Sequence, residues 1–312
     1  MVRSQNAFLK KEVKENMSRF SFLIPFLIWI FIPLLSLGLL QFSRWKRHRR
    51  GERPPFQDLL LRSPGEGLRR EIQDMSDDVI WYLVLMYSLP LLIYSMYLGI
   101  LSSGEPSAGA HIFLLIVLLG AVIFPVYKTS RIIAKRRHLR LGLAGEIAVG
   151  EELNRLMLDG YHVYHDFPAD RFNVDHVIVG RAGVFAVETK ARSKKLSGKA
   201  KSEAEVVYDG KQLKFSSWVT TEPLDQAKAQ ASWLSKWLSS AVGETVRAAP
   251  MVVIPGWFIS RKAADGVPVL NPKEVRAYFA SRRESVLSET VIQRICHQLE
   301  QKCRDVDLWE WY

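Results

Sequence analysis

Three long apolar stretches, residues 20–42, 79–101 and 110–127, interrupt an otherwise charged N-terminal region. Each has about the length that a helix needs to cross a hydrocarbon core, roughly 20 residues at about 1.5 Å of rise per residue. None of them contains Lys, Arg, Asp or Glu, whose ionised side chains are costly in lipid. The sequence therefore predicts a membrane region over residues 1–140 with three transmembrane helices; buried helices of a soluble core are the alternative.

The basic residues predict the orientation of these helices. Nine of them lie between the first two stretches, and a second group follows the third stretch, whereas residues 102–109 contain none. Loops rich in Lys and Arg stay on the cytoplasmic side. We therefore expect a multi-pass cell membrane protein in the lipid bilayer, with the long loop and the C-terminal half in the cytoplasm and the N-terminus outside.

The net charge of +11 is unevenly distributed. Residues 1–140 carry ten of the eleven surplus positive charges and residues 141–312 carry one. The basic balance thus reflects attraction to the cytoplasmic leaflet, and composition alone does not indicate nucleic acid. The two cysteines, Cys296 and Cys303, are seven apart in a predicted helix, about 10 Å and too far for a disulfide.

Residues 141–312 are enough for one soluble domain with its own core. The spacing of apolar residues predicts the following elements: helices over 141–158, 225–239, 272–280 and 289–302, strands over 161–167, 173–179, 183–190 and 249–259, and a hairpin over 206–215. Strands 173–179 and 183–190 are apolar on both faces, which is typical of strands covered on both sides. This order predicts an α/β sandwich with a central mixed sheet.

Acidic and basic side chains of two predicted strands form a candidate site. Glu188 and Lys190 are two apart in a strand and so project from the same face, and a short turn can bring Asp175 alongside them. Two carboxylates with waters suit Mg²⁺ or Mn²⁺, and the lysine can orient a water or neutralise charge on a phosphate. Glu146, on the first helix, can supply a third carboxylate. A surface ion pair at a strand end is the structural alternative.

Three separated motifs resemble a known family: GLAGEIAVGEELNRL at 142–156, NVDHVIVGRAGVFAVETKARS at 173–193 and EPLDQAKAQASWL at 222–234. Together they are similar to the nuclease-related domain (NERD) family of the PD-(D/E)XK nuclease superfamily, over roughly residues 141–260. The resemblance implies a restriction-endonuclease-like α/β/α fold and matches Glu146, Asp175, Glu188 and Lys190 to the family's acidic and lysine positions. It also matches Gln226 to a glutamine that supports the site or contacts nucleic acid. Val174 stands where the superfamily's nominal motif has proline.

A basic run follows the candidate site: Lys190, Arg192, Lys194, Lys195, Lys199 and Lys201. Beside a bound phosphate these side chains can hold a nucleic-acid backbone without reading its sequence; a solvated loop is the alternative. Other conspicuous residues are expected to be structural. His176 points to the strand face opposite Asp175, and Trp233 and Trp237 pack in the core. His162 and His165 are expected to be half-buried strand residues rather than metal ligands.

These features predict a membrane-anchored, divalent-metal-dependent nuclease that hydrolyses phosphodiester bonds, with DNA as the expected substrate. In this hypothesis Asp175 and Glu188 hold Mg²⁺ or Mn²⁺, Lys190 positions the water and Glu146 assists. The alternative is a catalytically inactive module that binds nucleic acid or protein at the membrane. A transporter is disfavoured because the apolar stretches lack charged groups.

Overall fold

The computed structural model describes residues 59–103, 107–194, 204–263, 265–282, 284 and 286–306, together with isolated helical positions at 31, 35, 38, 39, 42 and 46. The predicted span 20–42 therefore lies almost entirely outside the described residues, as do Lys195, Lys199 and Lys201 of the basic run. The chain forms two compact units, one of residues 1–56 and 75–134 and the other of residues 57–74 and 135–312.

The first unit consists, in its described part, of two helix segments that belong to α3 (Glu66–Ser103) and α4 (Ala108–Asn154). Their apolar side chains are largely exposed, for example 67% for Trp81, 64% for Phe113 and 62% for Ile123. Both helices are long and apolar enough to cross a membrane, and they contain the predicted spans 79–101 and 110–127. Two of the three predicted spans are thus found as helices of the right kind.

The sequence predicted a span ending at residue 127 and a separate helix over 141–158, whereas in the structure both belong to helix α4. It runs without interruption through Asn154 and continues as a 3-10 turn, η1 (Arg155–Asp159). Gly160, in the left-handed conformation at φ 83°, then ends the helix, as the Asp159-Gly160 pair indicates. No proline or glycine pair interrupts residues 128–154, so the helical backbone bonds continue.

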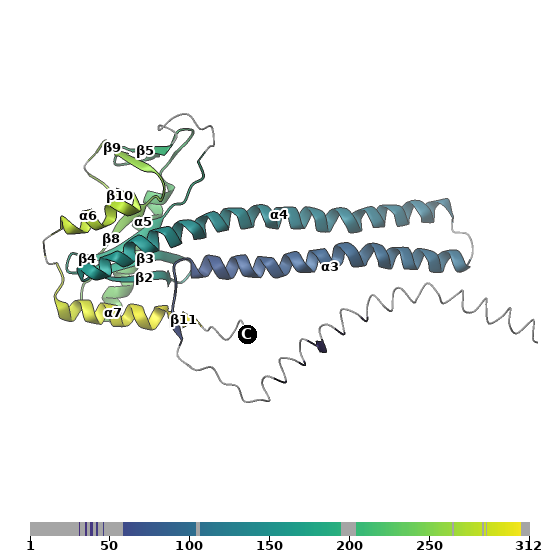
Figure 1. Cartoon of the computed structure of the whole chain (residues 1–312), viewed down its shortest axis with the longest axis horizontal. Helices are drawn as coiled ribbons and strands as arrows, with labels where there is room; N and C mark the ends of the chain where they lie inside the picture. Colours follow the sequence, from purple (N-terminus) through teal and green to yellow (C-terminus); the bar gives the residue numbers. More distant parts are fainter. Residues whose placement is uncertain are drawn as a thin grey trace, which may run out of the picture. The chain divides into compact units, whose positions relative to one another are not determined.

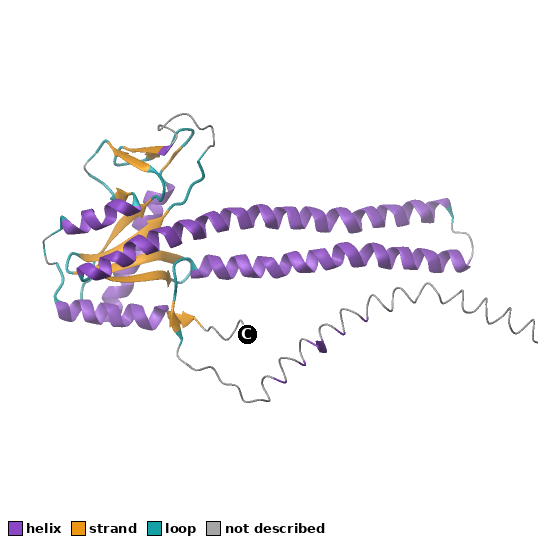
Figure 2. Cartoon of the chain, viewed as in Figure 1, coloured by secondary structure: helices purple, strands orange, loops and turns teal. Residues whose placement is uncertain are grey.

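The second unit is a mixed α/β domain (Figures 1 and 2). Its remaining elements are β1 (Leu60–Leu61), β2 (His162–Pro168), β3 (Asn173–Gly180), β4 (Gly183–Thr189), β5 (Glu205–Tyr208), β6 (Leu213–Lys214), β7 (Val219–Thr220), α5 (Glu222–Val242), β8 (Ala248–Val253), β9 (Phe258–Arg261), β10 (Val269–Leu270), η3 (Pro272–Glu274), α6 (Val275–Ala280), α7 (Glu289–Cys303) and β11 (Arg304–Val306).

Five strands form the central sheet in the order β10-β8-β4-β3-β2. The short turn Arg181-Ala182 makes β3 and β4 antiparallel, and β2 pairs antiparallel with β3. Helix α5 lies in the connection from β4 to β8, and because a crossover of this kind returns the chain in the same direction, β8 pairs parallel with β4. β10 is also parallel to β8. The predicted mixed sheet is confirmed.

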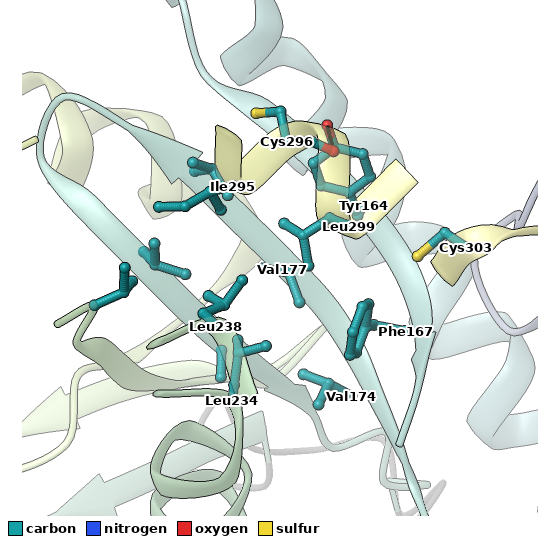
Figure 3. Packing of buried hydrophobic residues seen from close by; sticks show 14 of the residues in the cluster. Tyr164, Phe167, Val174, Val177, Leu234, Leu238, Ile295, Cys296, Leu299 and Cys303 are labelled. Carbon is teal, nitrogen blue, oxygen red and sulfur yellow. Dashed lines mark hydrogen bonds between the residues drawn. The ribbon is translucent and has the colours of Figure 1, made fainter. Parts of the chain in front are cut away.

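Helices cover both faces of this sheet, because side chains of successive strand residues point to opposite sides. One face packs against α5 and α7 through a cluster that includes Val177, Leu234 and Leu299 (Figure 3). The other face packs against the C-terminal part of α4, η1 and α6 through Leu153, Phe185 and other apolar residues. This double cover explains why β3 and β4 read as continuous apolar runs.

The predicted strand 249–259 is in fact two strands of different sheets. β8 belongs to the central sheet, whereas β9 joins a four-stranded sheet of order β7-β6-β5-β9. Pro255 cannot donate a ladder hydrogen bond and Gly256 has φ 79°, so the chain turns between the two strands. The small sheet packs on the start of α5 through Val206, Leu224 and their neighbours.

Residues 57–74 belong to the second unit, although they precede the two apolar helices in the chain. β1 pairs antiparallel with β11, and the N–H of Arg62 donates to the carbonyl oxygen of Cys303 at 3.0 Å. The unit thus contains residues that the sequence analysis assigned to the membrane region ending at residue 140.

Several residues expected to be structural are so. Cys296 and Cys303 are buried free thiols, consistent with the excluded disulfide. Trp233 and Trp237 pack against the sheet, and the ring of Trp237 lies 5.0 Å from that of Phe167. His162 and His165 lie on β2 as predicted, but His162 is exposed and His165 is buried, so neither is half-buried as expected.

Candidate active site

The pairing of β3 with β4 brings two acidic residues together. His176 pairs with Val187 in the antiparallel register, so the residue before the first, Asp175, and the residue after the second, Glu188, come next to each other. The N–H of Thr189 donates to Oδ2 of Asp175 at 2.7 Å, which holds this carboxylate against the end of β4. Glu188 is 3% exposed and Asp175 is half-buried. The two side chains thus meet at one end of the central strands.

Glu146 reaches the same place from α4, and glycines allow this helix to come close. A Cβ at Gly145 would lie 2.5 Å from Cβ of Ala191, and one at Gly150 would lie 2.5 Å from Cγ of Pro64. Real Cβ atoms do not approach so closely, so both positions require glycine. The motif GEIAVGEEL therefore combines an acidic side chain with the two contacts that bring its helix close to the residues after β4 and to the residues before α3.

Burial and neighbouring carboxylates oppose the ionisation of the three carboxyl groups. Burial, together with the charges of Asp175, Asp166 and Glu188, raises the pKa of Glu146 to about 9. Burial and the nearby Asp166 raise the pKa of Asp175 to about 7, although the Thr189 N–H and Lys190 act in the opposite direction. Burial and Asp175 also raise the pKa of Glu188. Carboxyl groups crowded in this way share protons at neutral pH unless a cation neutralises them.

Glu188 has a partner on α5 that the sequence analysis did not name. Nε2 of Gln230 donates to Oε2 of Glu188 at 2.8 Å, and Gln230 is 2% exposed. Gln226, which the resemblance suggested, is exposed one turn earlier on the helix. The apolar positions Ala227, Ala231 and Leu234 fix the buried side of α5, and their phase places residue 230 inward.

Lys190 lies between two glutamates. Its Nζ is 4.0 Å from Oε1 of Glu188 and donates to Oε1 of Glu222 at 2.9 Å. Arg192 also contacts Glu222, at 3.4 Å. Glu222 is largely exposed at the start of α5, so Lys190 reaches from the buried Glu188 toward solvent.

Among the other predicted phosphate-contacting residues, Lys194 is exposed, and its Nζ lies 5.6 Å from the ring centre of Trp257. Arg192 is half-buried, and its side chain is directed to Glu222. The structure therefore brings Glu146, Asp175, Glu188 and Lys190 together and places Arg192 next to them.

A chain of buried hydrogen bonds lies behind the site. Asn154 accepts from Nε2 of His165 at 2.9 Å, Nδ1 of His165 faces Nδ1 of His176 at 2.8 Å, and Nε2 of His176 faces the hydroxyl of Thr189 at 3.1 Å. Burial lowers the pKa of His165 to about 4, and burial and His165 lower that of His176. Both imidazoles are therefore neutral. As predicted, His176 is directed away from Asp175 and stabilises the strands.

The donor set fits a divalent cation that keeps several waters. Within the described residues no three His, Cys, Asp or Glu side chains converge as a closed metal cage. Mg²⁺ in proteins is usually held by one or two carboxylates and completes its octahedron with water. Asp175 and Glu188 supply such a pair, and the buried Oε1 of Gln230 has no hydrogen-bond partner in the described structure and could accept from a bound water.

The fold and the site define a mixed α/β domain with a buried carboxylate cluster and a lysine at the ends of its central strands. Residues 141–255 match the family described as the nuclease-related domain, NERD. The match contains all four clustered residues and extends through β8. Neither the curated proteins nor the solved structures contain a match to this chain.

Proposed function

We propose that the chain is a membrane-anchored, divalent-metal-dependent nuclease that hydrolyses phosphodiester bonds in DNA. The observation that carries this proposal is the clustering of Glu146, Asp175 and Glu188, in which the charge of Asp175 raises the pKa of both glutamates, with Lys190 beside Glu188. The match to the nuclease-related domain supports the same reaction class. A central mixed sheet with helices on both faces is compatible with a restriction-endonuclease-like fold.

In this proposal Asp175 and Glu188 bind Mg²⁺ or Mn²⁺, which would polarise a phosphoryl oxygen and lower the pKa of bound water. Gln230 fixes the orientation of the Glu188 carboxylate through its 2.8 Å hydrogen bond. Lys190 leaves Glu222 to orient the attacking water or to neutralise charge on the phosphate. Glu146, with its high pKa, is the group best placed to carry a proton in the reaction.

Membrane anchoring rests on α3 and α4. Their apolar side chains are exposed along lengths sufficient to cross a bilayer, and lipid is the solvent that such surfaces require. Residues 57–74 and 135–312 form one folded unit, so they must lie on the same side of the membrane. That side is the cytoplasm in our proposal, because both segments are preceded by or begin with basic residues.

The test uses the full chain, purified in detergent and incubated with plasmid, linear and single-stranded DNA and with RNA, in Mg²⁺, Mn²⁺ or EDTA. Cleavage that requires the metal and is abolished by Glu188→Ala and by Lys190→Ala is the expected result. Lys228→Ala, on the exposed side of α5, is the matched control and retains activity. Metal-independent binding of nucleic acid without cleavage would favour an inactive binding module instead.

A further inference from the structure

The segment from Leu60 to Gly67 lies outside the matched residues 141–255, yet it lines the carboxylate cluster. It enters the domain as strand β1, whose pairing with β11 and whose Arg62–Cys303 backbone hydrogen bond fix its position. It then turns at Gly65 and becomes α3. The residues just before this turn are therefore fixed by β11 and by the end of α7.

Arg62 connects this segment to two aspartates. Its Nη1 donates to Oδ2 of Asp166 at 2.8 Å, and its Nε and Nη2 donate to the two carboxylate oxygens of Asp305 at 2.8 and 2.6 Å. Asp166 is 3% exposed and also accepts from the N–H of Gly67 at 2.9 Å and from Asn173 at 2.9 Å. Both oxygens of the Asp166 carboxylate are thus paired, and the charge of this group raises the pKa of Glu146 and of Asp175.

Gly65 contacts Glu146 directly. Its backbone N–H lies close enough to the Glu146 carboxyl to act to lower the pKa of that group. Its φ of 70° lies in the left-handed region, and an added Cβ would collide with the side chain of Leu143 and lie 3.5 Å from Oε2 of Glu146. The position therefore requires glycine for its backbone conformation and for space.

We propose that Arg62 and Gly65 are positioning residues of the carboxylate site, so that the site is complete only when residues 60–67 are docked. Gly65 packs against the Glu146 carboxyl, and Arg62 pairs with Asp166 and acts against the rise in pKa that burial causes in this carboxyl. The chain continues from this turn into α3 and its apolar stretch, so the site and the start of a predicted membrane helix share one turn. The catalytic consequence rests on the proposed nuclease function; the docking itself does not.

The first experiment compares Gly65→Ala with Gly160→Ala in the full chain. Both glycines have left-handed φ angles, 70° and 83°, but a Cβ at Gly160 meets no atom within 4 Å. Both substitutions place an alanine at a left-handed φ, but only the first collides with Leu143, three residues before Glu146 on α4, and so pushes on the helix segment that carries Glu146. We expect Gly65→Ala to lower kcat for DNA cleavage about tenfold or more at unchanged KM, because misplacement of a reacting group by about 1 Å can cost a factor of 100. Gly160→Ala should retain the parental kcat.

The second experiment does not depend on activity. Hydrogen exchange is followed in peptides that contain residues 62–67, for the parent, Glu146→Ala and the exposed control Glu151→Ala. Loss of the carboxyl acceptor should accelerate exchange of the Gly65 amide at least tenfold, and Glu151→Ala should leave it unchanged. This measurement also decides the question if Gly65→Ala does not fold.

The outcomes separate the two proposals. If the parent does not cleave but Glu146→Ala accelerates exchange at Gly65, the nuclease proposal fails and the docking of residues 60–67 stands. If exchange at Gly65 is the same in Glu146→Ala and the parent, or if a folded Gly65→Ala retains the parental kcat, the positioning role is refuted whatever the parent cleaves.

Discussion

Replacement of Glu146 by glutamine should stabilise the metal-free protein, although it removes a residue of the site. The folded-state pKa of Glu146 is about 9 and its ordinary value is 4.5. Because the folded pKa is raised, its contribution to stability is complete below pH 4.5 and is lost as the pH rises toward 9. Since pH 7 lies 2.5 units above the ordinary pKa of 4.5, the stability that the folded protein has lost at pH 7, relative to low pH, is about 3 kcal/mol. Glutamine is neutral at every pH and keeps an oxygen for the N–H of Gly65.

The assay is thermal unfolding of the parent and Glu146→Gln in EDTA, between pH 5 and pH 8. We expect a Tm for the variant that is about 6–12 °C higher at pH 7, since about 1 kcal/mol shifts Tm by 2–4 °C in a domain of this size. The difference should nearly vanish at pH 5, and saturating Mg²⁺ should narrow it by stabilising the parent. Glu151→Gln, on the exposed side of the same helix, is the control. A difference that is absent, or that does not grow with pH, would refute the reasoning.

Three further predictions concern the surroundings of the site. Arg62→Ala leaves the buried Asp166 without its cation and should lower the free energy of unfolding, measured in urea, by about 3–5 kcal/mol. The control Arg276→Ala breaks an exposed bidentate pair with Asp159 and should lower it clearly less. Equal losses in the two variants would contradict this. The folded pKa of His165, about 4, lies below its ordinary 6.5, so its contribution is present above pH 6.5 and lost as the pH falls. The stability deficit of His165→Gln relative to the parent should therefore shrink by about 2 kcal/mol between pH 7 and pH 5, and a constant deficit would be inconsistent with a neutral buried imidazole. Gln230→Leu should weaken Mg²⁺ binding about tenfold in a calorimetric titration, whereas Gln226→Leu should not; the reverse order would place the functional glutamine one turn earlier.

The sequence predicts the central strands well because their pattern is local. Asp175 and Glu188 interrupt runs that are apolar on both faces, and a two-residue turn allows one pairing of β3 with β4. The role of Gln230 was not predicted, because Gln226 and Gln230 lie one turn apart on α5 and only the packing of the helix shows which of them is buried.

Other features depend on partners that are distant in the chain. Residues 60–67 read as part of a basic loop, since their partners Asp166 and Asp305 are 104 and 243 residues away. The pairing of Lys190 with Glu222 across 32 residues is equally invisible in a strand pattern. Pro255-Gly256 indicates a break within the predicted strand 249–259. Nothing in the local sequence indicates that β9, after this break, joins a second sheet.

The pairing of β1 with β11 has a consequence for biosynthesis. At about 5–20 residues per second, a ribosome needs roughly 12–50 s to make the 243 residues that separate Arg62 from Asp305. During that interval the apolar stretches of α3 and α4 leave the ribosome and are free to insert, while Arg62 and the buried face of its segment still lack their last strand. In the proposed membrane-anchored protein, completion of the carboxylate site therefore comes after insertion, and nascent chains that stop before β11 should carry an α/β domain whose residues 60–67 have not docked.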